Sequence, residues 1–192
     1  MFEVFATYLK SKIEISDPQL REIEALCKPH RAEKGEVLLK VNEICKAVFF
    51  VTHGCLRSYV VDKKKREHII QFAPENWWIS ERLSMMSKEP GMYFIDAVED
   101  TDYLSMEEDF FQKLPEIVPA SKAMNDRLQL NSFRAFRKRL ISLLSDTAED
   151  RYLNFIQTHP SLALRIPQKM IASYLGITPE SLSRIRKSLS HQ

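Results

Sequence analysis

Polar side chains near the C-terminal end of the sequence have the chemistry and spacing to contact the edges of nucleic-acid bases. Glu180 and Arg184 are four residues apart, so on a helix they face the same way. A carboxylate can accept from cytosine N4, and a guanidinium can donate two bonds to guanine O6 and N7. Further candidates for contacts with bases or phosphates surround this pair: Gln168, Lys169, Thr178, Ser181, Ser183, Arg186 and Lys187. The chemistry would be recognition of double-stranded DNA in its major groove.

Two short helices joined by a tight turn would hold this pair on an outer surface. The segment 168–185, QKMIASYLGITPESLSRI, has the small Ala172 where two crossing helices must touch. Gly176 follows four residues later, where the turn needs a left-handed backbone. Thr178 and Pro179 then provide an N-cap and a first-turn proline. Apolar residues that would form the shared core are Ile171, Leu175, Ile177, Leu182 and Ile185. The pattern predicts a helix-turn-helix.

The charge of the chain is unevenly distributed. Residues 151–192 carry six Lys and Arg against one acid, a net +5, whereas the whole chain carries +2 and the first 150 residues therefore −3. A basic unit attached to an acidic body suits a polyanionic partner, because each cation near a phosphate releases condensed counterions. A solvated basic face is an equally common explanation of the asymmetry by itself.

A long amphipathic pattern precedes the predicted helix-turn-helix. Apolar residues follow one another mostly three or four positions apart from 117 to 144, which predicts one helix about 40 Å long. A small barrel cannot cover such a stripe, so we expect a second copy of the chain to pair with it. The expected contacts of this homodimer are Ile117, Ala120, Met124, Leu128 and Phe136. The alternative is a helix packed only on its own barrel.

The N-terminal half has the pattern of a short helix followed by a β-rich domain. Ser16, Asp17 and Pro18 begin a helix that ends near Cys27. Short β-rich runs separated by turn residues follow at 36–41, 47–52, 55–61, 67–73 and 93–98. The charged run 62–66 fits a solvated hairpin loop better than a nucleic-acid site. The fold class is α+β: an antiparallel β-barrel or jelly roll over 1–114, a long helix over 115–145, and an all-α helix-turn-helix domain over 146–192.

Composition restricts the class of protein further. Hydrophobic residues make up 44% and charged residues 28%, with 4 Gly and 9 Pro, which is typical of a globular protein. No apolar run is long enough for a membrane span and the N-terminus has no signal-peptide pattern, so we expect a cytoplasmic protein without a membrane partner. Cys27, Cys45 and Cys55 are widely spaced and interpreted as reduced thiols.

The order of parts resembles the Crp/Fnr family of bacterial transcriptional regulators over nearly the whole chain. The stretches KGEVL (34–38), AVFFVTHGCLRSYV (47–60) and AVEDT (97–101) resemble strands of that family's cyclic-nucleotide-binding-like barrel. The stretch ITPESLSRIRKSL (177–189) resembles its recognition helix, and the resemblance assigns base contacts to Glu180 and Arg184. Pro179 stands where the family has another base-contacting Arg, so the preferred DNA sequence should differ. The resemblance implies a homodimer on a pseudo-palindromic site, with RNA polymerase as a further partner.

The family's β-wing after the recognition helix has no counterpart before the sequence ends at Gln192. We therefore expect contacts with the DNA backbone to come from Lys169, Arg186 and Lys187.

The expected effector site departs from the family pattern. Members that bind cyclic AMP hold its phosphate with a Gly-Glu start of a short helix and a following Arg-Ser pair. Here Glu81 remains, but Ser80 replaces the glycine and Gly91-Met92 replace Arg-Ser, so a phosphate would lack its counter-charge. We expect no cyclic AMP binding and no cofactor. Residues for an unknown apolar effector, if there is one, are Trp78, Glu81, Arg82 and Tyr93, and core packing is the alternative.

Two other functions remain open from the residues. A metal-dependent cupin-like enzyme needs His and carboxylates that converge, but His30, His53 and His68 are scattered without HxH spacing, so we expect no metal and no enzyme. A nucleotide-sensing module that regulates a protein without binding DNA is the second alternative.

Overall fold

The computed structural model describes residues 1–190, which divide into two compact units. The barrel unit comprises Met1–Val60 and Gln71–Gln129, and the helical unit comprises Val61–Ile70 and the chain from Leu130 onward. The helical unit has 14 Lys and Arg against 6 Asp and Glu, a net +8, so the barrel unit has a net −6 within the total of +2. The two structural units therefore differ more in net charge, +8 against −6, than residues 151–192 and 1–150 do, +5 against −3.

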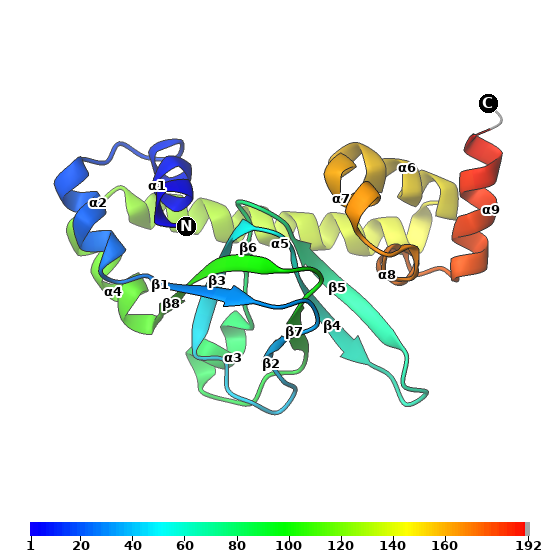
Figure 1. The fold of residues 1–192 in the computed structure, drawn as a ribbon, viewed down its shortest axis with the longest axis horizontal. Coiled ribbons are helices and arrows are strands. Elements are labelled where there is room, and N and C mark those ends of the chain that lie inside the picture. The colour runs from blue at the N-terminus through cyan, green and yellow to red at the C-terminus, as the bar shows by residue number, and fades with distance from the viewer. Residues whose placement is uncertain (191–192) are drawn as a thin grey trace. The chain divides into compact units, whose positions relative to one another are not determined.

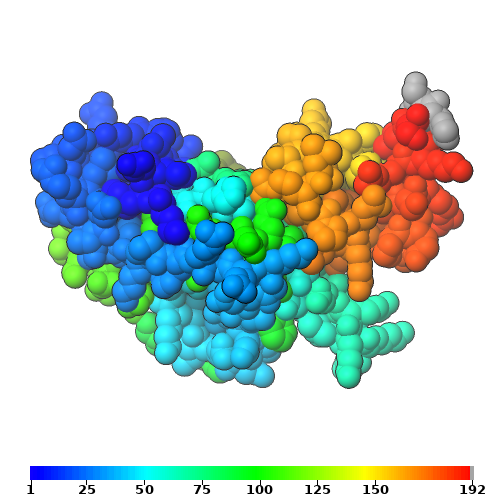
Figure 2. Space-filling view, viewed as in Figure 1, coloured from blue at the N-terminus to red at the C-terminus, as the bar shows by residue number. Residues whose placement is uncertain are grey.

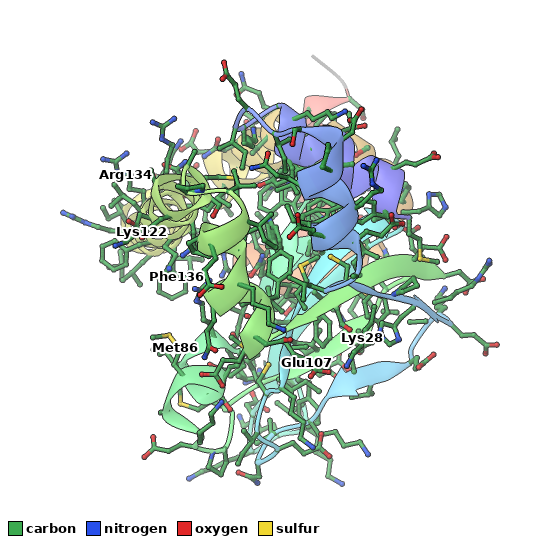
Figure 3. All side chains as sticks on the ribbon, turned by 90° about the vertical axis from the view of Figure 1, so that its left-hand side faces the viewer. Lys28, Met86, Glu107, Lys122, Arg134 and Phe136 are labelled. Atoms are coloured by element: carbon green, nitrogen blue, oxygen red, sulfur yellow. The ribbon has the colours of Figure 1, made fainter. Side chains whose placement is uncertain are left out.

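Two four-stranded antiparallel sheets form the barrel, as the sequence pattern predicts (Figure 1). Their strand orders are β1-β8-β3-β6 and β2-β7-β4-β5. The strands of the first sheet are β1 (Lys28–Ala32), β8 (Thr101–Glu107), β3 (Ala47–His53) and β6 (Trp78–Ile79). Those of the second are β2 (Val37–Leu39), β7 (Phe94–Ala97), β4 (Leu56–Val61) and β5 (Glu67–Ala73). Lys28 and Glu107 form an ion pair at the β1–β8 edge (Figure 3).

Alternation along the central strands separates two cores. On β3 and β8, Val51 and Tyr103 pair and face the barrel interior with residues of the second sheet. Phe50 and Leu104 pair on the same strands but face the opposite side, because successive side chains alternate across a strand. That outer face packs against helices α1 (Phe2–Lys10), α2 (Asp17–Glu24) and α4 (Glu108–Ile117) and the start of α5. The first sheet is thus buried on both faces.

The sequence patterns missed β1, β6, β8, α1 and α4. Strand β1 has four exposed residues before Ala32 and so lacks an apolar alternation. Strand β6 has only two residues, and polar residues interrupt the apolar pattern of β8. Helix α1 has buried residues at positions 5 and 9, a helical spacing that could have indicated it. The predicted helix after Ser16 is confirmed as α2, with Ser16 and Gln19 forming a capping box.

The long helix begins later than predicted. Helix α4 ends at Ile117, and α5 (Ser121–Ser145) starts after a short non-helical connection that includes Ala120. Pro119 lies in this connection, and a proline disfavours helical backbone at the residue before it. The expectation of one helix from Ile117 to Leu144 is therefore wrong at its N-terminal end.

The helical unit contains the C-terminal part of α5 and four shorter helices. These are α6 (Ala148–Thr158), α7 (Pro160–Arg165), α8 (Gln168–Leu175) and α9 (Pro179–Leu189). Thr147 caps α6 through the backbone N–H of Asp150. The buried side chains of these helices are Tyr152, Phe155, Leu162, Ile166, Ile171, Ala172, Leu175 and Leu182. Among residues 1–190, no helix has both the length and the apolar character of a membrane span.

Candidate nucleic-acid interface

Helices α8 and α9 form the pair that the sequence predicts. Ala172 is fully buried where the helices meet, beside Ile171 and Leu182. Gly176 has φ +68° and ends α8 in the left-handed conformation. A Cβ at this position would lie 3.1 Å from Leu143 Cδ2, so space as well as backbone conformation favours glycine. The amide of Ile177 then donates to Ala172 O at 3.0 Å, which closes the turn.

Thr178 begins α9 as its N-cap. Its hydroxyl accepts from the amide of Ser181 at 3.2 Å, and Pro179 occupies the first turn, where a missing N–H costs nothing. Glu180 lies in the same turn, near the positive end of the helix dipole. Its own backbone amide, the Thr178 hydroxyl and, to a smaller extent, Arg184 hold the pKa of the Glu180 carboxyl below its ordinary value. Glu180 is thus an ionised acceptor at neutral pH.

The exposed face of the pair carries most of the predicted DNA-contacting residues. Glu180 and Arg184 are both exposed, one helical turn apart on α9. Arg184 Nη2 lies 3.3 Å from Ser181 Oγ, so the guanidinium stays beside the first turn of its helix. The other exposed members of the predicted set are Gln168, Lys169, Thr178, Ser183 and Lys187. Ser181 and Arg186 are half-buried, which reduces the surface they offer to a ligand.

Arg151, one of the six basic residues of 151–192, forms hydrogen bonds to backbone carbonyl groups of its own unit. Arg151 Nε donates to Leu175 O at 3.0 Å, and Arg151 Nη1 donates to Asp146 O at 2.7 Å. It therefore satisfies carbonyl groups at the ends of α8 and α5, which helix termini leave without partners. The sequence gives no signal that separates Arg151 from the basic residues of the exposed face.

The apolar residues of α5 lie on two different faces. Met124 is buried and Leu128 packs beside it in the core of the barrel unit, with Ile117 at the end of α4. Between Leu128 and Phe133 the spacing is five residues, which turns the apolar stripe by about 140° around the helix. The predicted dimer stripe therefore combines a core face with an exposed face. Of its five residues, Phe136 and the small Ala120, which precedes α5, are exposed.

The exposed face of α5 lies within the helical unit. Phe133 is 63% exposed, Phe136 58% and Leu144 81%. Leu130, Leu140 and Ile141 continue the same face. Figure 3 shows Phe136 and Arg134 projecting from the helix. We call Leu130, Phe133, Phe136, Leu140, Ile141 and Leu144 the α5 stripe.

The four predicted effector residues have different surroundings. Trp78 donates its indole N–H to Tyr8 Oη at 3.1 Å and packs edge-on against Phe5 and Phe50 in the outer core under α1. Trp78 also packs against the barrel-interior core, as Tyr93 does. Tyr93 instead donates its hydroxyl to Ser80 O at 2.7 Å, next to Glu81. Core packing, the alternative named above, describes Trp78.

Glu81 and Arg82 keep polar atoms that the fold does not satisfy. Glu81 is 4% exposed, and its Oε2 has no hydrogen-bond partner among the described residues. Burial raises the pKa of its carboxyl. Arg82, in α3 (Arg82–Ser87), lies over the Phe111 ring at 5.0 Å and approaches Asn125 Oδ1 at 3.4 Å. Met92, where the family pattern has a serine after its arginine, is exposed and offers no charge.

Comparison with known proteins agrees with this architecture. The family model described as cyclic nucleotide-binding domain matches residues 29–116. FnrA, a transcriptional activator protein of Stutzerimonas stutzeri, is 24% identical over 166 residues, 80% of this chain and 66% of FnrA. The chain is thus similar to regulators of the Crp/Fnr family. Among solved structures, FixK2 of Bradyrhizobium japonicum superposes with a TM-score of 0.75 at 21% identity, over 86% of this chain and 85% of FixK2.

A Crp/Fnr family regulator from Eubacterium rectale has a TM-score of 0.67 at 19% identity and covers 92% of this chain and 84% of that one. At these identities the solved structures establish the Crp/Fnr fold and no more. The chain spans slightly less than two thirds of the length of FnrA. Within residues 1–190 there is also no group of three or more His, Cys, Asp or Glu side chains that could hold a metal ion.

Proposed function

We propose that this protein is a sequence-specific DNA-binding transcriptional regulator of the Crp/Fnr family. The observation that carries the proposal is the pair Glu180 and Arg184, exposed one turn apart on a capped helix whose other face is fixed by Ala172 and Leu182. Such a helix can enter the major groove, where a carboxylate and a guanidinium distinguish the members of a G·C pair. FnrA and the Eubacterium rectale protein bear the names of transcriptional regulators.

The active form in this proposal is a homodimer joined by the α5 stripe. Six large apolar side chains exposed along one helix are costly to leave in water, and a second α5 is complementary to them by symmetry. A dimer presents two α9 helices to successive major grooves about 34 Å apart. The domain boundaries at 114 and 145, and RNA polymerase as a partner, stay predictions.

Selection of bound duplexes from a random DNA pool tests the regulator proposal. We expect enrichment of a pseudo-palindrome whose half-sites each contain a G·C pair and lie about one helical turn apart. A protein that regulates a partner without binding DNA would give a final pool identical to the starting pool.

We further propose that cyclic AMP is not the effector. Gly91, which stands where the family pattern has its arginine, offers no counter-charge to a phosphate, and Arg82 is held between Phe111 and Asn125. Isothermal titration of the protein with cyclic AMP should give no binding heat above dilution. Saturable binding at micromolar concentration would overturn this proposal.

A further inference from the structure

The part of the β4–β5 hairpin around its turn, Val61–Ile70, belongs to the helical unit and is hydrogen-bonded to α8. Ser173, on α8, donates its hydroxyl to Glu67 O at 2.7 Å and accepts from the amide of Ile69 at 3.1 Å. One side chain thus satisfies a carbonyl and an amide of the hairpin backbone. Ser173 lies outside the apolar pattern of α8, and nothing in the sequence assigns it a partner 104 residues away.

Arg139 strengthens the same connection from α5. Its guanidinium donates to Ile70 O at 2.8 Å, to Ile69 O at 2.9 Å and to Tyr174 O at 2.8 Å. It also lies over the Tyr174 ring at 4.1 Å. Charged donors make the stronger hydrogen bonds of folded proteins, and three of them join α5, α8 and the hairpin. The hairpin is therefore held firmly beside the helix pair.

The tip of this hairpin is strongly basic and its acid is already engaged. Asp62 accepts from the amides of Lys64 and Arg66 at 2.8 and 3.0 Å and pairs with the Arg66 guanidinium. Lys63, Lys64 and Lys65 are exposed, and their ammonium groups form no ion pair with any of residues 1–190. In Figure 2 the side chains of the tip stand out from the surface. Three unpaired cations on a rigid turn form a preorganised anion-binding surface.

We propose that Lys63, Lys64 and Lys65 bind the phosphate backbone of DNA next to the site read by α9. The inference rests on the proposed function and adds to it a second, sequence-independent contact. Duplex DNA is the polyanion that the helical unit, with its net +8, would meet first. The sequence pattern alone favours a solvated loop for these lysines, and the hydrogen bonds of Ser173 and Arg139 are what connect them to the DNA-binding helices.

The test is the salt dependence of binding by the full chain, measured by fluorescence anisotropy on the selected duplex and on random duplex. The triple variant Lys63→Gln, Lys64→Gln, Lys65→Asn removes the charges, and Asn tolerates the positive φ at residue 65. Each lost phosphate contact should reduce the slope of log K against log salt concentration by about 0.9, so the triple variant should lose about 2 to 3. The preference for selected over random duplex should not change, because phosphate contacts carry no sequence information.

A matched control removes three exposed lysines from the barrel unit: Lys34→Gln, Lys40→Gln and Lys46→Gln. This control has the same net charge as the triple variant, and its slope should equal that of the wild type. Equal slopes for the hairpin variant and the wild type, with specific binding retained, would overturn the hairpin contact and leave the regulator function standing. That result is expected if the tip binds an acidic protein instead. A wild type that binds no duplex would overturn both.

A second variant tests whether Ser173 acts through the hairpin. Ser173→Ala should weaken binding about two- to tenfold, the effect of losing one or two hydrogen bonds that hold the tip in place. In the triple-variant background the same substitution should have little further effect, because the tip no longer carries charge. Full additivity of the two changes would contradict a connection between Ser173 and the lysines.

Discussion

Arg184→Ala should weaken binding to the selected duplex about 5- to 150-fold, which corresponds to about 1–3 kcal/mol for one bidentate guanidinium–guanine contact. Arg184 is exposed, and its hydrogen bond is to Ser181 of its own helix, so its removal leaves the core of α8 and α9 intact. Affinity for random duplex should fall much less. Repeating the selection with the variant should show relaxed preference at one base pair in each half-site.

Two further variants separate base recognition from general attraction to DNA. Arg184→Lys keeps the charge but loses the planar two-donor geometry, so it should lose specificity nearly as much as Arg184→Ala. Lys187→Ala, at an exposed position later on the same helix, should weaken binding evenly on all sequences. Equal losses on selected and random duplex in Arg184→Ala would show that Arg184 contacts phosphate and not a base.

Replacing Phe136 and Leu140 by Glu should convert the proposed dimer into a monomer. Each large apolar side chain that is buried contributes about 1.5–3 kcal/mol, and in a symmetric dimer every substitution acts twice. Both residues are exposed within their own unit, so the variant should still fold, with a circular dichroism spectrum like that of the wild type, although its melting temperature should fall because dimerisation no longer stabilises it. Sedimentation velocity at micromolar concentration is the measurement, and specific DNA binding should be lost with the dimer.

The matched control is the double variant Asn131→Glu, Ala135→Glu, which adds the same two negative charges at exposed positions on the opposite side of α5. It should sediment as the wild type does. Met124 and Leu128 are unsuitable for this experiment because they contribute to the core of the barrel unit, where a charge would unfold the protein. If the Phe136 and Leu140 variant remained dimeric, another surface would have to form the interface.

Local sequence patterns predicted many of the helices, turns and strands, because capping and turn conformation depend on residues close together in the chain. The turn from α8 to α9 depends on Gly176, Thr178 and Pro179, and each acts through its own backbone and near neighbours. The cap of α2 at Ser16 and the strands predicted at 47–52 and 67–73, which match β3 and β5, have the same local basis. Strand β1 was missed because an edge strand with four exposed residues is defined by its partner β8 and not by its own pattern.

The α5 helix shows where periodicity is insufficient. Spacing of three or four residues identified the helix, but a single step of five between Leu128 and Phe133 moved the stripe to another face. The sequence therefore could not assign Met124 to the core and Phe136 to the surface. The sequence could not place Trp78 for a similar reason, because the aromatic rings that its indole meets include those of α1, a helix far away in the sequence.

By itself, the sequence determined the order of β-barrel, long helix and the α8–α9 helix pair, since capping, turn conformation and apolar periodicity are set by residues within a few positions of one another. Only the tertiary structure decided which residues of those elements remain exposed and what the non-local polar groups bind. Ser173 and Arg139 meet backbone groups of residues 67–70 across 69 or more positions of chain, and such contacts leave no periodic signal in the sequence. Their physical basis is the need of backbone carbonyl and amide groups for partners, which folding in three dimensions supplies.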